Sequence, residues 1–158
     1  MAKPYDGGKP HRMLPYPIKR DKRMTFMLWS SEIAVGLNDV DDQHRWLVDR
    51  INHLHSELSS PAPKSAAVAE VLEGLMDYTM NHFIMEEELF ERYAYPDTEA
   101  HKAQHNKFTS TIMNALTDHE DGANVSHDVL EFLKHWLIQH IMRTDKVYVP
   151  FLKAHGVT

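Results

Sequence analysis

The stretch HWLIQHIMRTDKVY, residues 135–148, predicts a helix whose buried side contains two unexpected polar residues. Its apolar residues at helical spacing are Trp136, Leu137, Ile141, Val147 and Tyr148. His140 falls on the same side as Trp136, where a core residue is expected, and Asp145 follows further along. Five residues of a regular α-helix rotate by about 500°, which leaves His140 and Asp145 about 140° apart. We therefore predict a wide turn or π-bulge between them, or alternatively a regular helix from which Asp145 reaches around to a shared site.

The composition indicates a globular domain that is rich in histidine. The chain has 158 residues, 42% of them hydrophobic, and 12 histidines, the commonest metal-ligating residue. It has no cysteine, which excludes disulfides and thiolate metal sites, and we expect a cytoplasmic protein. The formal net charge of -6 argues against a nucleic-acid partner, and no apolar run approaches the ~18 residues of a membrane span.

Three more amphipathic helices precede this stretch. The four predicted helices cover approximately residues 41–59, 65–93, 98–119 and 126–148. Their expected N-caps from the second helix onward are Ser65, either Asp97 or Thr98, and Ser126. Prolines follow the first and second helices, and no segment shows the alternation of a strand. We predict an all-α fold over residues 28–158, an up-down-up-down antiparallel four-helix bundle.

Residues 1–27 are expected to form an irregular N-terminal arm. The segment MAKPYDGGKPHRMLPYPIKRDKRM, residues 1–24, is rich in proline and glycine and shows no periodicity. Its basic residues Lys19, Arg20, Lys22 and Arg23 contrast with the acidic remainder of the chain. They form either a solvated tail or a segment that docks a protein partner.

Each predicted helix carries histidine on its inner stripe, where leucine is expected. The polar residues on these stripes are His44, His82, Glu86, His101, His105, His140 and Asp145. Residues four apart share a helix face, so His82 lies beside Glu86 and His101 lies beside His105. A single histidine on an apolar face is usually part of the core, but seven ionisable groups in one interior need strong compensation. Imidazoles together with carboxylates suit transition metals, and two carboxylates that can bridge suggest two metal ions.

The remaining histidines are expected to be solvated, because they fall in loops, in tails or off the inner stripes. They are His11, His53, His55, His119, His127, His135 and His155.

The ordered set of motifs resembles the hemerythrins, in particular the single-domain bacterial members. The matching motifs are DDQH ending at His44, HFIMEEE from His82, YPDTEAHKAQH ending at His105, and WLIQHIMRTDKVY ending at Tyr148. The resemblance covers residues 28–152. It implies a non-heme centre of two iron ions with an oxo or hydroxo bridge, which binds dioxygen reversibly.

The resemblance also implies a role for each ligand. His101, His105 and His140 would hold one iron, His44 and His82 would hold the other, and Glu86 and Asp145 would bridge both. The second iron would then keep an open position for dioxygen. The side chains expected to line the oxygen pocket, or simply to pack the core, are Phe83, Trp136, Leu137 and Ile141. Candidates for orienting the imidazoles are Asp42, Gln43 and Tyr148, whereas Glu87 and Glu88 are interpreted as surface charge.

Three functions remain open at this point. The first is a monomeric oxygen carrier, store or delivery protein that is not an enzyme. The second is an oxygen or redox sensor, which we expect to need a separate protein partner because no output domain follows the bundle. The third is a di-iron enzyme, namely a ferroxidase, peroxidase or nitric oxide reductase. Carboxylate-rich di-iron oxidases use paired Glu-x-x-His motifs, and this nitrogen-rich ligand pattern instead favours oxygen binding.

Overall fold

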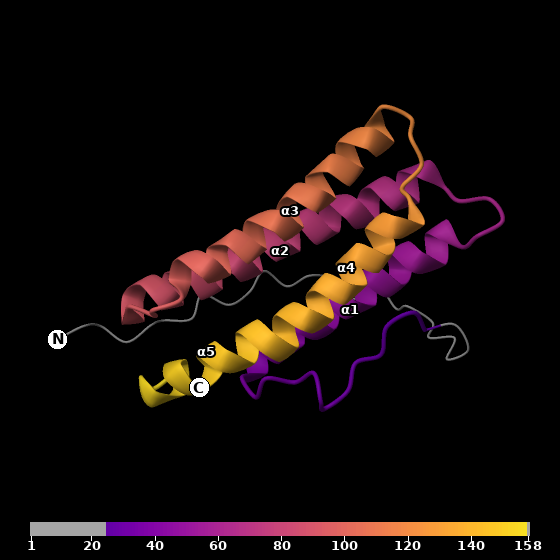
Figure 1. The fold of residues 1–158 in the computed structure, drawn as a ribbon. Coiled ribbons are helices and arrows are strands. Elements are labelled where there is room, and N and C mark those ends of the chain that lie inside the picture. Colours follow the sequence, from indigo (N-terminus) through magenta and orange to yellow (C-terminus); the bar gives the residue numbers. More distant parts are fainter. Residues whose placement is uncertain (1–24, 158) are drawn as a thin grey trace.

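The computed structural model describes residues 25–157, and these residues form a helical bundle without strands. Its elements are α1 Asn38–Leu58, α2 Ser65–Tyr93, α3 Thr98–Glu120, α4 His127–His140, the π-helix η1 Ile141–Asp145, and α5 Lys146–Ala154. The last three form one continuous helical segment, so the described residues contain four long rods (Figure 1). This arrangement confirms the predicted four-helix bundle.

The four rods pack so that each contacts two neighbours. Helix α2 lies between α1 and α3, and α4 closes the ring by contacting both α1 and α3. Figure 1 shows α2 beside α3 and α1 beside α4. Short connections between consecutive rods make neighbours antiparallel, which brings the beginning of α1 level with the end of α4.

Local interactions at the helix ends agree with some of the expected caps and not with others. Ser126 caps α4, because its hydroxyl oxygen accepts a hydrogen bond from the Val129 amide at 3.3 Å. Ser65 is the first residue of α2 and does not cap it; the N-cap is Lys64, whose side chain makes no capping hydrogen bond. The N-cap of α3 is Asp97, also without a side-chain cap.

The segment before α1 is attached to the bundle by side chains of α1. The buried carboxylate of Asp41 accepts hydrogen bonds from the Val35 amide at 2.7 Å and the Gly36 amide at 3.0 Å. Gly36 has a φ of 83°, a conformation that favours glycine, and it forms a turn just before α1. Asn52 forms two hydrogen bonds of 2.8 Å with the backbone of the buried Met27. Residues 1–24, including the basic residues of the predicted arm, lie outside the described residues.

Two apolar clusters fill the interior, and a layer of buried polar residues lies between them along the bundle. The larger cluster includes the fully buried Ile51, Leu54, Leu72, Leu75, Ile112 and Leu133. The smaller cluster includes Phe90, Tyr95, Tyr148 and Leu152 near the end of α2 and in α5. Apolar burial on both sides holds the four rods in register, and this register sets the positions of the polar layer.

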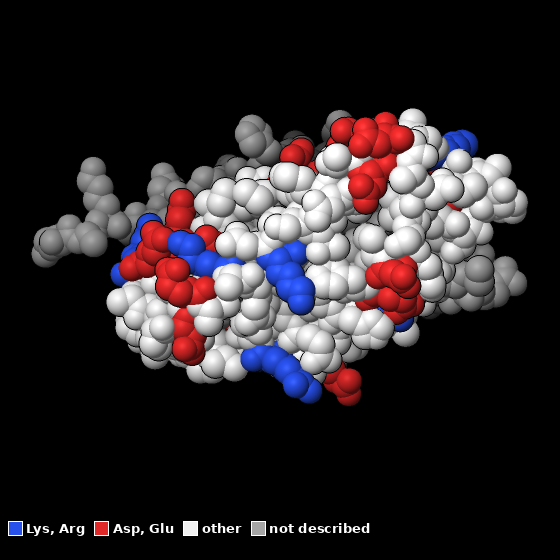
Figure 2. Space-filling view, turned by 45° about the horizontal axis from the view of Figure 1, so that its top comes forward, with Lys and Arg blue, Asp and Glu red and all other residues white. Residues whose placement is uncertain are grey.

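The exterior carries mixed charge on the face drawn in Figure 2. Acidic and basic side chains intermingle at one end, and separated basic side chains lie nearer the middle. Lys102 pairs with Glu91 at 3.0 Å and lies 3.8 Å from Glu87. Such mixing gives this face no continuous basic surface of the kind that binds nucleic acid. Within residues 25–157, no helix has the length and apolarity needed to cross a membrane.

Candidate metal centre

The seven polar residues predicted from the inner stripes meet in one buried cluster. Each is at most 3% exposed, and they are His44, His82, Glu86, His101, His105, His140 and Asp145. Potential ligand atoms lie within 4.8 Å of one another in two groups that share Glu86. One group adds His101, His105 and His140, and the other adds His44 and His82. The interior therefore presents two adjacent, unequal sets of nitrogen and oxygen atoms.

Glu86 connects the two groups because its two carboxylate oxygens face different histidines. Its Oε1 lies 3.5 Å from His82 Nε2. Its Oε2 lies 3.2 Å from His105 Nε2 and 3.5 Å from His101 Nε2. This is the orientation of a carboxylate that can bridge two ions.

Asp145 has the same divided orientation on the opposite helix. Its Oδ2 lies 3.2 Å from His44 Nε2, and its Oδ1 lies 3.1 Å from His140 Nε2 and 3.5 Å from His101 Nε2. The π-helix Ile141–Asp145 makes this possible, because the wider turn rotates Asp145 back toward His140. The structure thus confirms the predicted bulge, and the alternative of a regular helix is wrong.

Hydrogen bonds from neighbouring helices fix the tautomers of three of the five imidazoles. Amide oxygens can only accept, so His82 Nδ1 donates to Gln43 Oε1 and His140 Nδ1 donates to Gln104 Oε1 at 3.0 Å. Gln104 Oε1 also accepts from Thr144 Oγ1 at 3.0 Å. In both histidines the proton on Nδ1 leaves the Nε2 lone pair directed into the cluster.

The third oriented imidazole is His105, whose Nδ1 donates to Glu87 Oε1 at 2.8 Å. The interpretation of Glu87 as surface charge is therefore wrong, although its neighbour Glu88 is exposed as expected. Asp42 is also wrong as a candidate, because its side chain is 75% exposed and pairs with Arg45 at 3.3 Å. Gln43 is confirmed as an orienting residue.

Tyr148, the remaining candidate, orients a carboxylate and no imidazole. Its buried hydroxyl donates a hydrogen bond to Glu86 Oε1. Burial and the nearby carboxylates of Glu86 and Asp145 raise the pKa of Tyr148 well above its usual value. The phenol therefore keeps its proton and remains a donor.

The cluster favours the protonation states that metal ligands require. Burial lowers the pKa of His82 to about 4, so this imidazole is neutral near pH 7. Burial raises the pKa of Glu86, but His82, His101 and His105 outweigh it and bring the pKa well below the usual value. Burial and Glu86 raise the pKa of Asp145, but His140 and His44 outweigh these effects. The resulting pKa of Asp145 is lowered to about 2. Both carboxylates are thus ionised beside a neutral imidazole.

Spacing and unsatisfied atoms show that the cluster fits metal ions. Ligand atoms about 2.1 Å from a shared ion lie about 3.0 Å apart in an octahedron and about 3.4 Å apart in a tetrahedron. The contacts of 3.1–3.5 Å among the seven side chains match these separations. Several inward-facing atoms have no hydrogen-bond partner among the described residues, and they include Glu86 Oε2, Asp145 Oδ1, and Nε2 of His101, His105 and His140. A cation would satisfy them.

Apolar side chains surround this polar layer. Phe83 stacks on His105 with ring centroids 3.6 Å apart, and Trp136 stacks on His140 at 4.2 Å. Phe83, Leu137 and Ile141 are buried, whereas Trp136 is half-buried. Of the four side chains expected to line an oxygen pocket, Phe83 and Trp136 lie against candidate ligands. Leu137 and Ile141 belong to the apolar cluster that contains Phe83.

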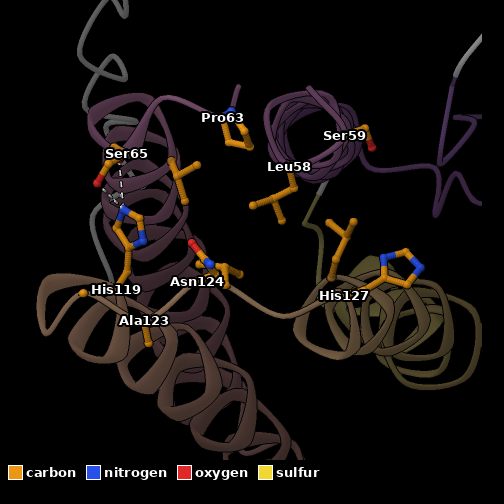
Figure 3. A pocket seen from close by; sticks show the side chains of 12 residues that line it. Leu58, Ser59, Pro63, Ser65, His119, Ala123, Asn124 and His127 are labelled. Atoms are coloured by element: carbon orange, nitrogen blue, oxygen red, sulfur yellow. Dashed lines mark hydrogen bonds between the residues drawn. The ribbon is translucent and has the colours of Figure 1, made fainter. Parts of the chain in front are cut away.

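The other histidines of residues 25–157 lie outside the cluster. His119 lies at the opposite end of the bundle, beside a pocket of about 570 Å³ (Figure 3). Its Nε2 donates to the Ser65 carbonyl at 2.9 Å and lies 3.1 Å from Ser65 Oγ. His127, His135 and His155 are exposed. His11 is among the residues that the structure does not describe.

Comparisons of sequence and of structure with known proteins point to one family. A family model described as Hemerythrin HHE cation binding domain matches residues 35–152. A bacteriohemerythrin from Stenotrophomonas maltophilia is 35% identical over 84% of this chain and 85% of its own. One from Methylococcus capsulatus is 32% identical over 83% of this chain and its full length. A crystal structure of wild-type hemerythrin superposes with a TM-score of 0.73 at 31% identity, covering 79% of this chain and 96% of that one. The chain belongs to the hemerythrin family.

Proposed function

We propose that this chain binds dioxygen reversibly at a pair of non-heme iron ions. His101, His105 and His140 would hold one iron, and His44 and His82 would hold the other. Glu86 and Asp145 would each offer one carboxylate oxygen to each iron. The observation that carries this proposal is the divided orientation of both carboxylates, each with one oxygen toward each histidine group. Because the second group has fewer histidines, it would leave room for a small ligand at its iron.

When bound, a ferrous pair supplies two electrons and an open position to dioxygen. The chain supplies the environment. Gln43, Gln104 and Glu87 hold three imidazoles in the tautomer that presents Nε2 to the ions. Phe83 and Leu137, both nearly inaccessible to solvent, keep water away from the ligand.

A shortage of proton donors near the site favours release of intact oxygen over its reduction. Cleavage of an O–O bond needs proton donors, and the apolar residues Phe83, Leu137 and Ile141 offer none. Tyr148 is the phenol that contacts the candidate bridge, and its hydroxyl proton is already engaged in the hydrogen bond to Glu86 Oε1. This supports a binding protein more strongly than a ferroxidase, a peroxidase or a nitric oxide reductase.

The test combines metal analysis with an optical spectrum. The purified chain is reduced without air, exposed to air and then flushed with argon. We expect two irons per chain and a charge-transfer band that appears in oxygen and disappears under argon. A chain without iron, or one that passes irreversibly to the ferric form in a single exposure, would contradict the proposal.

A further inference from the structure

Thr79 is a fully buried polar residue that the proposed iron ligation does not use. Its side chain is 0% exposed, and its hydroxyl has no hydrogen-bond partner among the described residues. The other unpartnered atoms on nearly inaccessible side chains all belong to the seven candidate ligands. Thr79 therefore needs an explanation of its own.

The hydroxyl of Thr79 differs from those of threonines on the neighbouring helix. Thr109 and Thr111 of α3 donate to the carbonyl four residues earlier, at 3.2 Å and 2.9 Å. A helical threonine commonly satisfies its hydroxyl in this way. Thr79 makes no such bond. Its hydroxyl is therefore available to a group other than the helix backbone.

The position of Thr79 places it in the layer next to the iron with fewer proposed ligands. It precedes His82 and Phe83 by one turn of α2 and shares their face. On the same side, one turn from the other candidate ligands, the residues are Leu47 and Val48 after His44, Phe108 and Thr109 after His105, and Trp136 and Leu137 before His140. Thr109 is the polar residue of this set, and its hydroxyl already bonds to the His105 carbonyl. The rings of Phe83, Phe108 and Trp136 contact one another within this layer. Thr79 thus contributes a hydroxyl without a partner to a largely apolar wall.

We propose that the Thr79 hydroxyl donates a hydrogen bond to the small ligand held at the open iron position. This inference rests on the proposed function. A hydroxyl can donate to a diatomic that gains negative charge or to a small linear anion, and an apolar surrounding strengthens such a bond. Thr79 is then a residue that selects polarised ligands over apolar gases of similar size.

The test uses azide as the ligand and Thr79→Val as the variant, because valine keeps the shape and removes the hydroxyl. In the ferric, iron-loaded protein we expect azide affinity, measured by optical titration, to fall about tenfold. Thr79→Ser restores the donor and should recover most of the affinity. Thr111→Val removes a helix-bonded hydroxyl elsewhere and should leave azide affinity unchanged.

A second readout uses the metal-free protein. Because the hydroxyl has no partner within the chain, metal-free Thr79→Val should melt at the wild-type temperature or above it. A clear loss of melting temperature would show a structural role and overturn the inference.

The outcomes separate this inference from the proposed function. Wild-type protein with two irons and an equal azide affinity in Thr79→Val overturns the role of Thr79 alone. A rise in azide affinity in that variant also overturns it, because the hydroxyl would then hold a water that the ligand must displace. A wild-type chain that binds no iron overturns the proposed function and this inference with it.

Discussion

The two halves of the bundle are built from the same four rods but have different interiors. In the half that contains the end of α1 and the beginning of α2, leucine and isoleucine fill the interior, as at Ile51, Leu54 and Leu72. In the half that contains the beginning of α1 and the end of α4, the corresponding positions are occupied by the candidate ligands, which include His44 and His140. The first interior stabilises the fold through burial, and the second places charged groups at a free-energy cost.

The residues that stabilise the fold and the candidate ligands are therefore separated along the bundle axis. The apolar half and the smaller cluster around Phe90 and Tyr148 enclose the polar layer. Such a framework can hold the candidate ligands in position before any ion binds. The comparison therefore predicts that changes in the polar half alter metal binding, whereas changes in the apolar half alter stability.

His101→Ala should cause a greater loss than any other variant proposed below, because it should lose bound iron. His101 Nε2 lies 3.5 Å from both Glu86 and Asp145, so its removal opens the cluster where both carboxylates meet. We expect bound iron to fall well below two per chain, while circular dichroism of the metal-free variant stays helical. His135→Ala is the control, since the His135 side chain is 70% exposed. Full iron retention in His101→Ala would refute the ligand assignment.

Leu72→Ala should lower the stability of the fold and leave iron binding unchanged. Leu72 is 0% exposed in the apolar half, and truncation of a buried leucine costs about 2–5 kcal/mol of unfolding free energy. Urea unfolding of the metal-free protein measures this cost. Iron per folded chain should remain at the wild-type value. Met113→Ala is the control because Met113 is 57% exposed, and it should change stability little. Equal stability of Leu72→Ala and wild type would contradict the role of the apolar half.

The polar half should also make stability depend on pH. Burial lowers the pKa of His82 to about 4 in the folded chain, against a reference value of 6.5. Between these values the unfolded chain binds more protons, so the free energy of unfolding falls as the pH decreases from 6.5 to about 4. Denaturant unfolding of the metal-free protein across this range measures the slope. His82→Gln should flatten it, and an unchanged slope in that variant would assign the dependence to other groups.

The smallest of these effects concerns a residue beside the ligands. Gln104→Leu removes the acceptor that orients His140, and loss of such a partner typically weakens metal binding about 10–100-fold. Competition with a chelator measures the change. Gln139→Leu, on the exposed side of α4, is the matched control. If both variants retain iron equally well, the Gln104 contact does not contribute to binding.

The interior of the bundle could be predicted from the sequence because helix periodicity identifies buried positions directly. His44, His82 and His140 replace apolar residues on regular stripes, so their convergence follows once the four rods are packed. Even the π-helix could be predicted, since His140 and Asp145 do not share a face on a regular helix.

The residues that orient the ligands were harder to predict because they lie at the edge of the stripes. Glu87 points partly to solvent, and only the position of α3 reveals its contact with His105. Gln104 likewise needs the register of α3 against α4 before its contact with His140 can be seen. Asp42 and Gln43 are adjacent in the sequence, but only Gln43 faces the neighbouring helix α2. Periodicity alone does not resolve such boundary positions.

The proposed function requires the polar half to bind oxygen and to return it unchanged. The most direct measurement is the amount of oxygen taken up by the reduced protein and then released under vacuum, followed with an oxygen electrode. We predict uptake of one dioxygen for every two irons and recovery of nearly all of it over repeated cycles. Uptake without recovery, with the oxygen consumed and the iron left ferric, would contradict reversible binding and indicate a redox enzyme or sensor.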